Sequence, residues 1–365
     1  MSFVLDAEQL QFAEALHDQL AAADVPAVAR QWAAGDRKRG QALWYSLAEA
    51  GVAALAVPQQ WDGLGAHPAD LVIACEELGH HAMPGPIAES LAAVPKLLAS
   101  LAASDAGLAA EAAAADQGGR PPLAPRQERI DGWLRQLAAG ELIGTLAWPP
   151  LLPYAADAEL AGLVLLAGQD SVQLAEVSSA QRSVHAGRLV CAVAGNEPLA
   201  AGPAAAHAVQ QAFEFGALAS AAQLLGAGRA LLDCAAAHAA QRTQFGSPVG
   251  SFQAVKHQLA NVLIALEFAR PLLFAAAVAL ADDPAGAPRD VSAAKVACTD
   301  AARLAARVAL QVHGAIGYTA EHDLSLWLTL VRAVSPAWGS QRWHRARVLA
   351  ALAGPASRAD EAGGA

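Results

Sequence analysis

The sequence predicts a mainly α-helical protein built from two or three structural units. Three observations favour this fold class: a length of 365 residues, a composition rich in aliphatic residues with only 5% aromatics, and Ala- and Leu-rich runs with helical spacing. A chain of this length can bury a large hydrophobic core. It is therefore too long to be a small binding module.

The N-terminal part is expected to be a helical domain over residues 1–140. Apolar residues recur at helical spacing from residue 6 to about residue 115. Residues 116–129 are rich in Gly, Pro and Arg and are expected to form a loop, followed by one short helix over residues 132–140. Turn signals interrupt the helical pattern at residues 57–58, 62–65 and 84–86.

A small middle β domain is expected over residues 141–203. The apolar runs in this region are shorter, and Gly, Asp, Ser or Asn bound each of them, which is typical of strands. The predicted strands are residues 160–167, 172–177 and 189–194.

The C-terminal part is expected to be a four-helix bundle over residues 204–352. The helical period returns there in long pieces with short connections. The connections are predicted at residues 246–250, 282–288, 314–319 and 335–340. Residues 353–365 are expected to form a flexible tail.

Charge and cysteine usage exclude several classes of protein. A net charge of −10 without a local Lys/Arg cluster argues against nucleic-acid binding. The four cysteines lie far apart without C-x-x-C spacing, and the chain opens amphipathically rather than as a signal peptide, so a cytoplasmic location is expected. Polar residues interrupt every apolar run, so no membrane span is expected.

The sharpest local motif is R-T-Q-F-G-S-P at residues 242–248, followed by F-Q at residues 252–253. A plain helix end explains part of it: Gly246 would end the helix, Pro248 would prevent its continuation, and Arg242 would interact with the helix dipole. This explanation leaves other residues of the motif unaccounted for.

Gln244, Phe245 and Gln253 are the residues that a helix end does not require. A guanidinium such as that of Arg242, placed beside amide side chains at a helix boundary, is suited to binding a pyrophosphate. The motif therefore also indicates a nucleotide-binding site.

A second motif, Q-V-H-G-A-I-G-Y-T, spans residues 311–319. Gly314 and Gly317 are consistent with a helix end and a turn. A pair of glycines also lets the backbone approach a ligand closely. Taken alone, this second motif is a weak signal.

Together and in this order, the two motifs resemble the flavin-binding signatures of acyl-CoA dehydrogenases. The family shows R-x-Q-F-G-x-P with a following F-Q, and then Q-x-x-G-G-x-G-[YF]-T-x-E; here only Ala315 replaces a glycine. Further matches occur at residues 57–58, 63–65, 76–79, 84, 86 and 321–324. The resemblance implies the family architecture: an N-terminal helical domain, a shortened middle β domain and a C-terminal four-helix bundle.

The resemblance also implies a cofactor, flavin adenine dinucleotide (FAD), which in this family lies across a subunit interface. The two signatures come from the subunit opposite the one that holds the isoalloxazine ring. Arg242 would contact the pyrophosphate. Packing or hydrogen bonding near the adenosine half would come from Gln244, Phe245 and Gln253, and close backbone contact with that half from Gln311, Gly314 and Gly317.

The middle region departs from the family. An L-T-E-P-x-x-G-S-D segment usually supports the flavin ring and the acyl substrate, but the aligned stretch here has Ala147 for Thr and Trp148 for Glu. The rest of that segment and a second family stretch, G-x-K-x-W-I-T-N, are missing. The ring half of FAD therefore has no evident site in this chain.

The catalytic base is also missing. Removal of the α-proton of an acyl thioester needs a carboxylate within hydrogen-bond reach. Most of the family carries this Glu before the final helix, where this chain has Trp338; a minority carries it on an earlier helix, at the position of Gly216. Glu214 lies two residues away and so is rotated by about 200° around that helix. Glu267 and Glu321 are expected to be solvated or capping carboxylates.

Three functions stay open. In the first, this chain is the non-catalytic subunit of a heterotetrameric acyl-CoA dehydrogenase, resembling bacterial enzymes that act on steroid side chains; a catalytic partner subunit, an acyl-CoA substrate and an electron-transfer flavoprotein as electron acceptor are then implied. In the second, the chain is a homomeric enzyme with an unrecognised base: Glu214, His207, His238, His257 or His322. In the third, it is a non-enzymatic acyl-CoA-binding or scaffold relative.

Overall fold

The computed structural model describes residues 5–115, 125–283 and 285–353, and it confirms a mainly α-helical protein with a small sheet. The first six helices are α1 (Ala7–Ala22), α2 (Val25–Ala33), α3 (Lys38–Glu49), α4 (Pro68–His80), α5 (Val94–Ala115) and α6 (Pro125–Ala138). Asp6 begins α1 with a capping box. Its carboxylate accepts from the Gln9 backbone N–H at 2.8 Å, and the side-chain oxygen of Gln9 accepts from the Asp6 backbone N–H.

The start of α6 corrects the sequence prediction. Residues 125–129 are helical rather than part of a loop, and α6 ends at Ala138. Pro125 fits the first helical position, and Ile130, Leu134 and Leu137 repeat at the spacing of one helical face and are buried. The remainder of the predicted loop, residues 116–124, lies outside the described residues.

The sheet has five strands in the order β1-β3-β4-β5-β2, with β1 parallel to β3 and the other pairs antiparallel. The strands are β1 (Gly144–Ala147), β2 (Ala155–Ala156), β3 (Leu163–Ala167), β4 (Ser171–Arg182) and β5 (Leu189–Ala201). β4 and β5 extend past the predicted strands. Most residues of the added parts are exposed and pair through the backbone, although Leu199 and Ala200 of β5 are buried, so the apolar runs mark only part of each strand.

The C-terminal part contains five helices rather than four: α7 (Pro203–Gln241), α8 (Gln253–Asp282), α9 (Ala287–His313), α10 (Leu324–Val334) and α11 (Gln341–Ala353). Each predicted connection separates two of them. Three helices are long, whereas α10 and α11 are short. The predicted tail beyond Ala353 lies outside the described residues.

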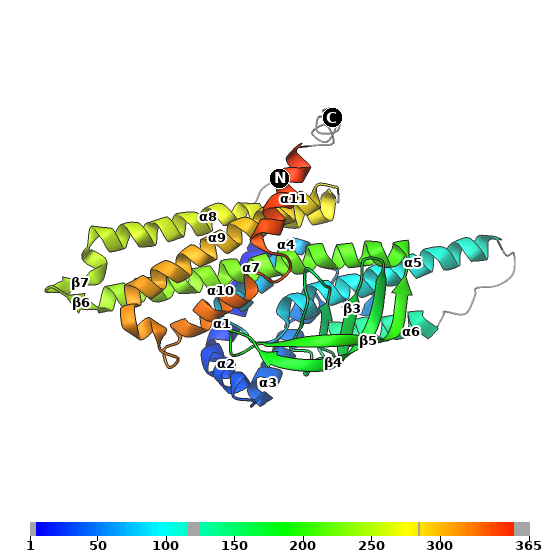
Figure 1. Ribbon diagram of the computed structural model, residues 1–365, viewed down its shortest axis with the longest axis horizontal. Coiled ribbons are helices and arrows are strands. Elements are labelled where there is room, and N and C mark those ends of the chain that lie inside the picture. Colours follow the sequence, from blue (N-terminus) through cyan, green and yellow to red (C-terminus); the bar gives the residue numbers. More distant parts are fainter. Residues whose placement is uncertain (1–4, 116–124, 284, 354–365) are drawn as a thin grey trace, which may run out of the picture.

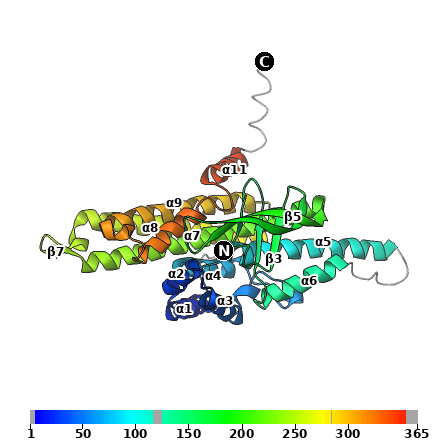
Figure 2. The same cartoon turned by 60° about the horizontal axis from the view of Figure 1, so that its bottom comes forward.

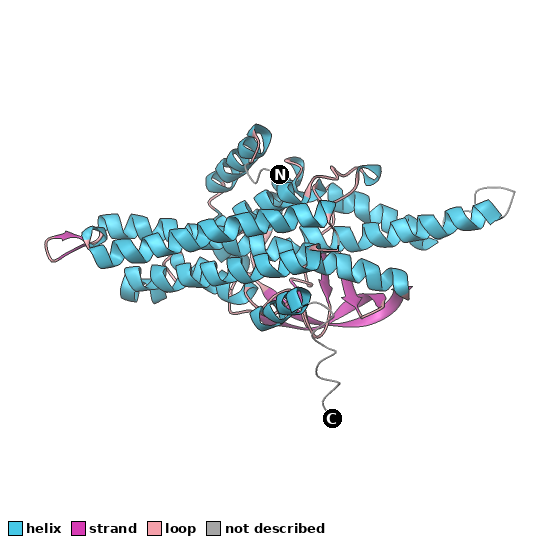
Figure 3. Cartoon of the chain, turned by 90° about the horizontal axis from the view of Figure 1, so that it is seen from above, coloured by secondary structure: helices cyan, strands magenta, loops and turns pink. Residues whose placement is uncertain are grey.

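The long helices run side by side along the molecule, and the sheet flanks them at the end opposite the short hairpin β6–β7 (Thr243–Gln244 and Ser247–Pro248) (Figures 1 and 3). Helices α1 to α4 pack on another side of this bundle (Figure 2). The helices α7 and α8 have the length and hydropathy of membrane spans, but 89% of the apolar window of α7 is buried inside the structure, against 44% for α8. Helix α7 is therefore a core helix of this fold.

Two glycines allow α4 and α7 to cross in close contact. A Cβ atom on Gly226 would lie 1.8 Å from the Glu76 carbonyl oxygen, and one on Gly79 would lie 2.2 Å from that of Gln223. Any larger side chain would force the helices apart. This contact brings the C-terminal end of α4 against the middle of α7.

Candidate functional site

The first flavin-signature motif forms the connection between α7 and α8. Arg242 ends α7 with extended backbone, and Thr243 and Gln244 pair with Pro248 and Ser247 as a β-hairpin. Phe245 and Gly246 both have positive φ, at 54° and 78°, as a tight two-residue hairpin turn requires. Gly246 therefore turns the hairpin and does not end the helix.

The hairpin presents its side chains to solvent. Phe245 is 94% exposed, and its ring contacts only that of half-exposed Phe252 edge-on, with centroids 6.3 Å apart. Among the described residues, the Arg242 guanidinium and the Gln253 amide have no hydrogen-bond or ion-pair partner, and the Gln244 amide donates only to the neighbouring Thr243 carbonyl. A large exposed ring beside unpaired polar groups is typical of a binding surface.

The second motif ends α9 at the same end of the bundle. His313, at the end of α9, stacks on His238 of the last turn of α7, with ring centroids 4.2 Å apart. Gln311 is exposed. Gly314 has φ 65° and faces open space, so its backbone is accessible. Gly317 is buried. A Cβ atom there would lie 3.1 Å from side-chain atoms of both Leu310 and His313, so the absence of a side chain allows this close packing.

The two alternative base positions face each other in the structure. A Cβ atom on Gly216 would lie 2.5 Å from Cζ3 of the Trp338 indole, and Trp338 is 1% exposed. The indole therefore fills the space in front of Gly216. Neither position carries a carboxylate, and a side chain at 216 cannot enter without moving Trp338.

Trp338 belongs to an aromatic cluster centred on Phe213 of α7, in which Phe213, Trp338 and His344 are buried and two further rings are half-buried. The ring of Phe213 lies 5.2 Å from those of Trp148 and Trp343 and 6.1 Å from those of Trp338 and His344. We call these five residues the aromatic cluster. Trp148 and Trp338 stand at the two positions where the sequence resemblance leads us to expect a Glu, and these two distant positions converge on one ring.

Hydrogen bonds hold Trp338 in place. Its backbone has a positive φ of 59°, and its carbonyl accepts from Nε2 of His344 at 2.8 Å. Nδ1 of His344 accepts from the Ser292 hydroxyl at 3.0 Å. Burial lowers the pKa of His344 to about 3, so the ring is neutral at pH 7.

Glu214 is not available as a base. It is 2% exposed and forms a two-point ion pair with Arg347, of which the Nη1 to Oε2 distance is 3.0 Å. The Gln210 amide also donates to it. A carboxylate that is buried and held at both oxygens by a guanidinium is not free to reach a substrate.

Comparisons with known proteins identify the family of this chain. Residues 6–114 match the acyl-CoA dehydrogenase N-terminal domain and residues 206–353 match the C-terminal domain. The chain is 30% identical over 307 residues to acyl-CoA dehydrogenase IpdE2 of Mycobacterium tuberculosis (strain ATCC 25618 / H37Rv), covering 83% of this chain and 84% of that protein. This chain belongs to the acyl-CoA dehydrogenase family.

Solved structures of the family share the fold across nearly the whole chain. The ChsE4-ChsE5 complex from Mycobacterium tuberculosis aligns with a TM-score of 0.72 at 21% identity, covering 97% of this chain and 99% of that one. The Tcur3481-Tcur3483 steroid acyl-CoA dehydrogenase variant aligns with a TM-score of 0.74 at 21% identity, covering 96% and 99%.

Acyl-CoA dehydrogenases are FAD-dependent oxidoreductases, and the two halves of an FAD site fit this chain differently. The exposed hairpin end offers unpaired polar groups that suit the adenosine and pyrophosphate half. The positions at which the resemblance expects ring and base contacts are occupied by half-buried Trp148 and buried Trp338, which offer no carboxylate. The nearby cavity lined by Leu151, Tyr154 and Ala337 has a volume of about 180 Å³, whereas ligand pockets typically hold roughly 300–1,000 Å³.

Sequence reasoning identified Trp148 and Trp338 as departures of this acyl-CoA dehydrogenase relative but missed what surrounds them. Phe213, Trp343 and His344 complete the aromatic cluster. The signal was the dense group of large rings near residue 340 in a chain with 5% aromatics. The contact with α7 itself depends on tertiary packing.

Proposed function

We propose that this chain is the non-catalytic subunit of a heteromeric acyl-CoA dehydrogenase. In this proposal it contributes the adenosine and pyrophosphate side of an FAD site to a catalytic partner subunit. The partner supplies the base, the flavin-ring site and most substrate contacts. The assembly desaturates an acyl-CoA thioester between its α- and β-carbons, passes electrons to an electron-transfer flavoprotein and works in the cytoplasm.

One observation carries this proposal: the expected position of the base is filled by Trp338, while the flavin-signature residues apart from Ala315 are retained and the hairpin that carries the first motif is exposed. Removal of an α-proton requires a carboxylate at the substrate, and no other group replaces it at this place among the described residues. A subunit that kept only the interface half of the site needs a partner with the other half. Relatives whose structures carry two chain names, ChsE4-ChsE5 and Tcur3481-Tcur3483, support a two-component enzyme and a steroid-type acyl chain.

Exposed apolar side chains support association with another subunit. On α8, Ile264, Phe268 and Leu272 recur every fourth residue, and Phe268 is 74% exposed. Tyr318, beside the second motif, is 77% exposed. Apolar surface of this extent on a folded chain marks a protein interface.

The two alternatives make different demands on the structure. A homomeric enzyme needs another base, but Glu214 is paired with Arg347 and buried. A non-enzymatic scaffold needs no flavin contacts, yet Arg242 and Gln253 are exposed without partners among the described residues.

Co-expression with a candidate catalytic subunit tests the proposal. The candidate is a family member with the intact L-T-E-P segment and a Glu, encoded beside this chain. The two are expected to co-purify with bound FAD and to be reduced by an acyl-CoA. A complex that forms without FAD would favour the scaffold, whereas activity of this chain alone would favour the homomeric enzyme.

A further inference from the structure

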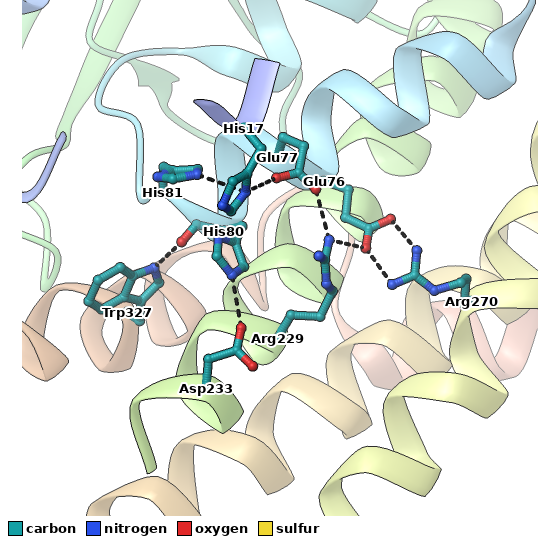
Figure 4. Close-up of polar contacts among 9 residues, drawn as sticks. All are labelled: His17, Glu76, Glu77, His80, His81, Arg229, Asp233, Arg270 and Trp327. Carbon is teal, nitrogen blue, oxygen red and sulfur yellow. Dashed lines mark hydrogen bonds and ion pairs between the residues drawn. The ribbon is translucent and has the colours of Figure 1, made fainter. Parts of the chain in front are cut away.

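Away from both regions, three histidines and a carboxylate converge where α1 meets the end of α4 (Figure 4). His17 comes from α1, Glu77 and His80 come from α4, and His81 follows directly. One potential ligand atom from each of these four residues lies within 4.8 Å of the other three. The helix contact at Gly79 fixes this end of α4 against α7.

The contacts at His17 cannot all be satisfied by the protein alone. Its Nδ1 lies 2.9 Å from Oε2 of Glu77 and 3.2 Å from Nε2 of His81. A ring nitrogen carries either one hydrogen or one lone pair. One hydrogen can be directed well at only one of the two neighbours, and a lone pair would face the carboxylate oxygen. A cation among these three atoms satisfies them together.

His80 has the environment of a metal-binding histidine. Its Nε2 lies 3.1 Å from Oδ2 of Asp233 on α7, while its Nδ1 is buried and has no hydrogen-bond partner among the described residues. A carboxylate that accepts one ring N–H leaves the other nitrogen with a lone pair, as in ligating histidines backed by a carboxylate. The carbonyl of His80 accepts from Nε1 of Trp327 at 2.7 Å, which anchors its backbone (Figure 4).

We propose that His17, Glu77, His80 and His81 form a four-coordinate site for a divalent transition-metal ion, with zinc the best match. Three imidazole nitrogens and one carboxylate oxygen are ligands that zinc accepts in tetrahedral geometry. Four protein ligands leave no open position, so the role of the ion is structural. It ties α1 to α4 and, through Asp233, to α7.

Binding requires the ligands to move toward one another and is opposed by a nearby charge. In tetrahedral geometry, bonds of about 2.0–2.2 Å place two ligand atoms about 3.3–3.6 Å apart, so a pair at the observed limit of 4.8 Å must close by roughly 1.2–1.5 Å. The His17 side chain is 41% exposed and is free to move. Nη1 of Arg229 lies 2.9 Å from Oε1 of Glu77 and 2.9 Å from Oε1 of Glu76, so Glu77 shares its charge with this guanidinium. The affinity is therefore lower than that of thiolate zinc sites.

The test uses the full chain, stripped with a chelator and titrated with Co²⁺ and then with Zn²⁺. One Co²⁺ per chain with the visible absorption of tetrahedral cobalt, displaced by Zn²⁺, is expected. His17→Ala should abolish this spectrum. His207→Ala, which removes an exposed histidine at the start of α7, is the matched control and should leave it unchanged. Asp233→Asn should weaken binding by about 10- to 100-fold through the orientation of His80.

Thermal unfolding provides a second measurement, because Zn²⁺ should raise the melting temperature of the wild type and not that of His17→Ala. Circular dichroism of His17→Ala and His80→Ala checks that both variants are folded. Wild type that binds no ion stoichiometrically overturns the proposal. So does a Co²⁺ spectrum that persists in both His17→Ala and His80→Ala, since the ion would then be held by other surface groups.

Discussion

The aromatic cluster and the β6–β7 hairpin end, which the proposed function assigns to the two halves of one site, differ in their exposure to solvent. At the cluster, Trp148 and Trp338 pack on Phe213, and the Trp338 indole fills the space in front of Gly216. At the hairpin, Phe245 and Arg242 extend into solvent; the Phe245 ring contacts only the edge of the Phe252 ring, and the Arg242 guanidinium has no hydrogen-bond or ion-pair partner among the described residues. A buried half that loses its function is free to become core, whereas an interface half must stay exposed to serve another subunit.

The largest expected effect follows from restoring the base. Trp338→Glu should destabilise the chain by about 3–5 kcal/mol, because it removes a buried indole and places a carboxylate among apolar rings. Denaturant unfolding measures this loss. The folded fraction should show no dehydrogenase activity, since the ring site is also missing. Anaerobic bleaching of flavin by acyl-CoA thioesters in this variant, without a partner, would contradict the account.

A smaller effect is expected at the hairpin. Arg242→Ala in the assembled complex should weaken FAD retention by about 1.5–3 kcal/mol, the value of a charge-assisted hydrogen bond to a pyrophosphate. The stability of the chain itself should not change, because Arg242 has no partner among the described residues. Equilibrium dialysis of FAD against the complex measures the loss. Arg342→Ala, at an exposed arginine of α11, is the control. Equal losses of FAD affinity in both variants would mean that Arg242 acts only through its general positive charge and does not contact the pyrophosphate.

The aromatic cluster should also give the chain a pH dependence. The folded pKa of His344 is lowered to about 3 by burial, with Lys295 and Arg347 adding to the effect, against its usual 6.5. Between these values the unfolded chain binds a proton that the folded chain does not, so stability falls as the pH drops below about 6.5. The loss from His344 at pH 5 is on the order of 1–2 kcal/mol relative to pH 7.

Urea midpoints between pH 5 and pH 7 test this assignment. His344→Gln should show a shallower decline than wild type, because an amide can donate to the Trp338 carbonyl without titrating. His207→Gln, at an exposed position, should follow the wild type. Identical slopes for wild type and His344→Gln would mean that other buried groups carry the acid sensitivity.

The smallest expected effect on the chain itself is at Phe245. Because this side chain is 94% exposed, Phe245→Ala should change the free energy of unfolding by less than about 0.5 kcal/mol. The same substitution should weaken assembly with the catalytic partner, measured by size-exclusion chromatography at falling concentration. A large loss of stability with unchanged assembly would place the ring in the core of this chain instead.

Much of the fold was predictable because the helical period and turn residues are local properties. The four connections between C-terminal helices follow from clusters such as residues 246–250 and 335–340. The predicted start of α6 was wrong, because the helix begins at Pro125 and its packing decides that start. The outer parts of β4 and β5 were missed, because backbone pairing extends these strands. Local sequence carries little of that information.

The candidate site was predictable only in part for the same reason. The substitutions at Gly216 and Trp338 could be recognised in the sequence, but their direct contact could not, because α7 and the segment before α11 meet only in the folded chain. The histidines of α1 and α4 are likewise far apart in sequence and adjacent in space. The roles of the seven flavin-signature residues stay predictions.

Flavin stoichiometry tests the central claim most directly. The chain is purified alone and together with its catalytic partner, and bound FAD is measured by absorbance after denaturation. In the proposed function this chain provides only one of the two surfaces that enclose the cofactor, so we expect little FAD on the chain alone and stoichiometric FAD on the complex. A homo-oligomer of this chain with nearly one FAD per chain would contradict the account.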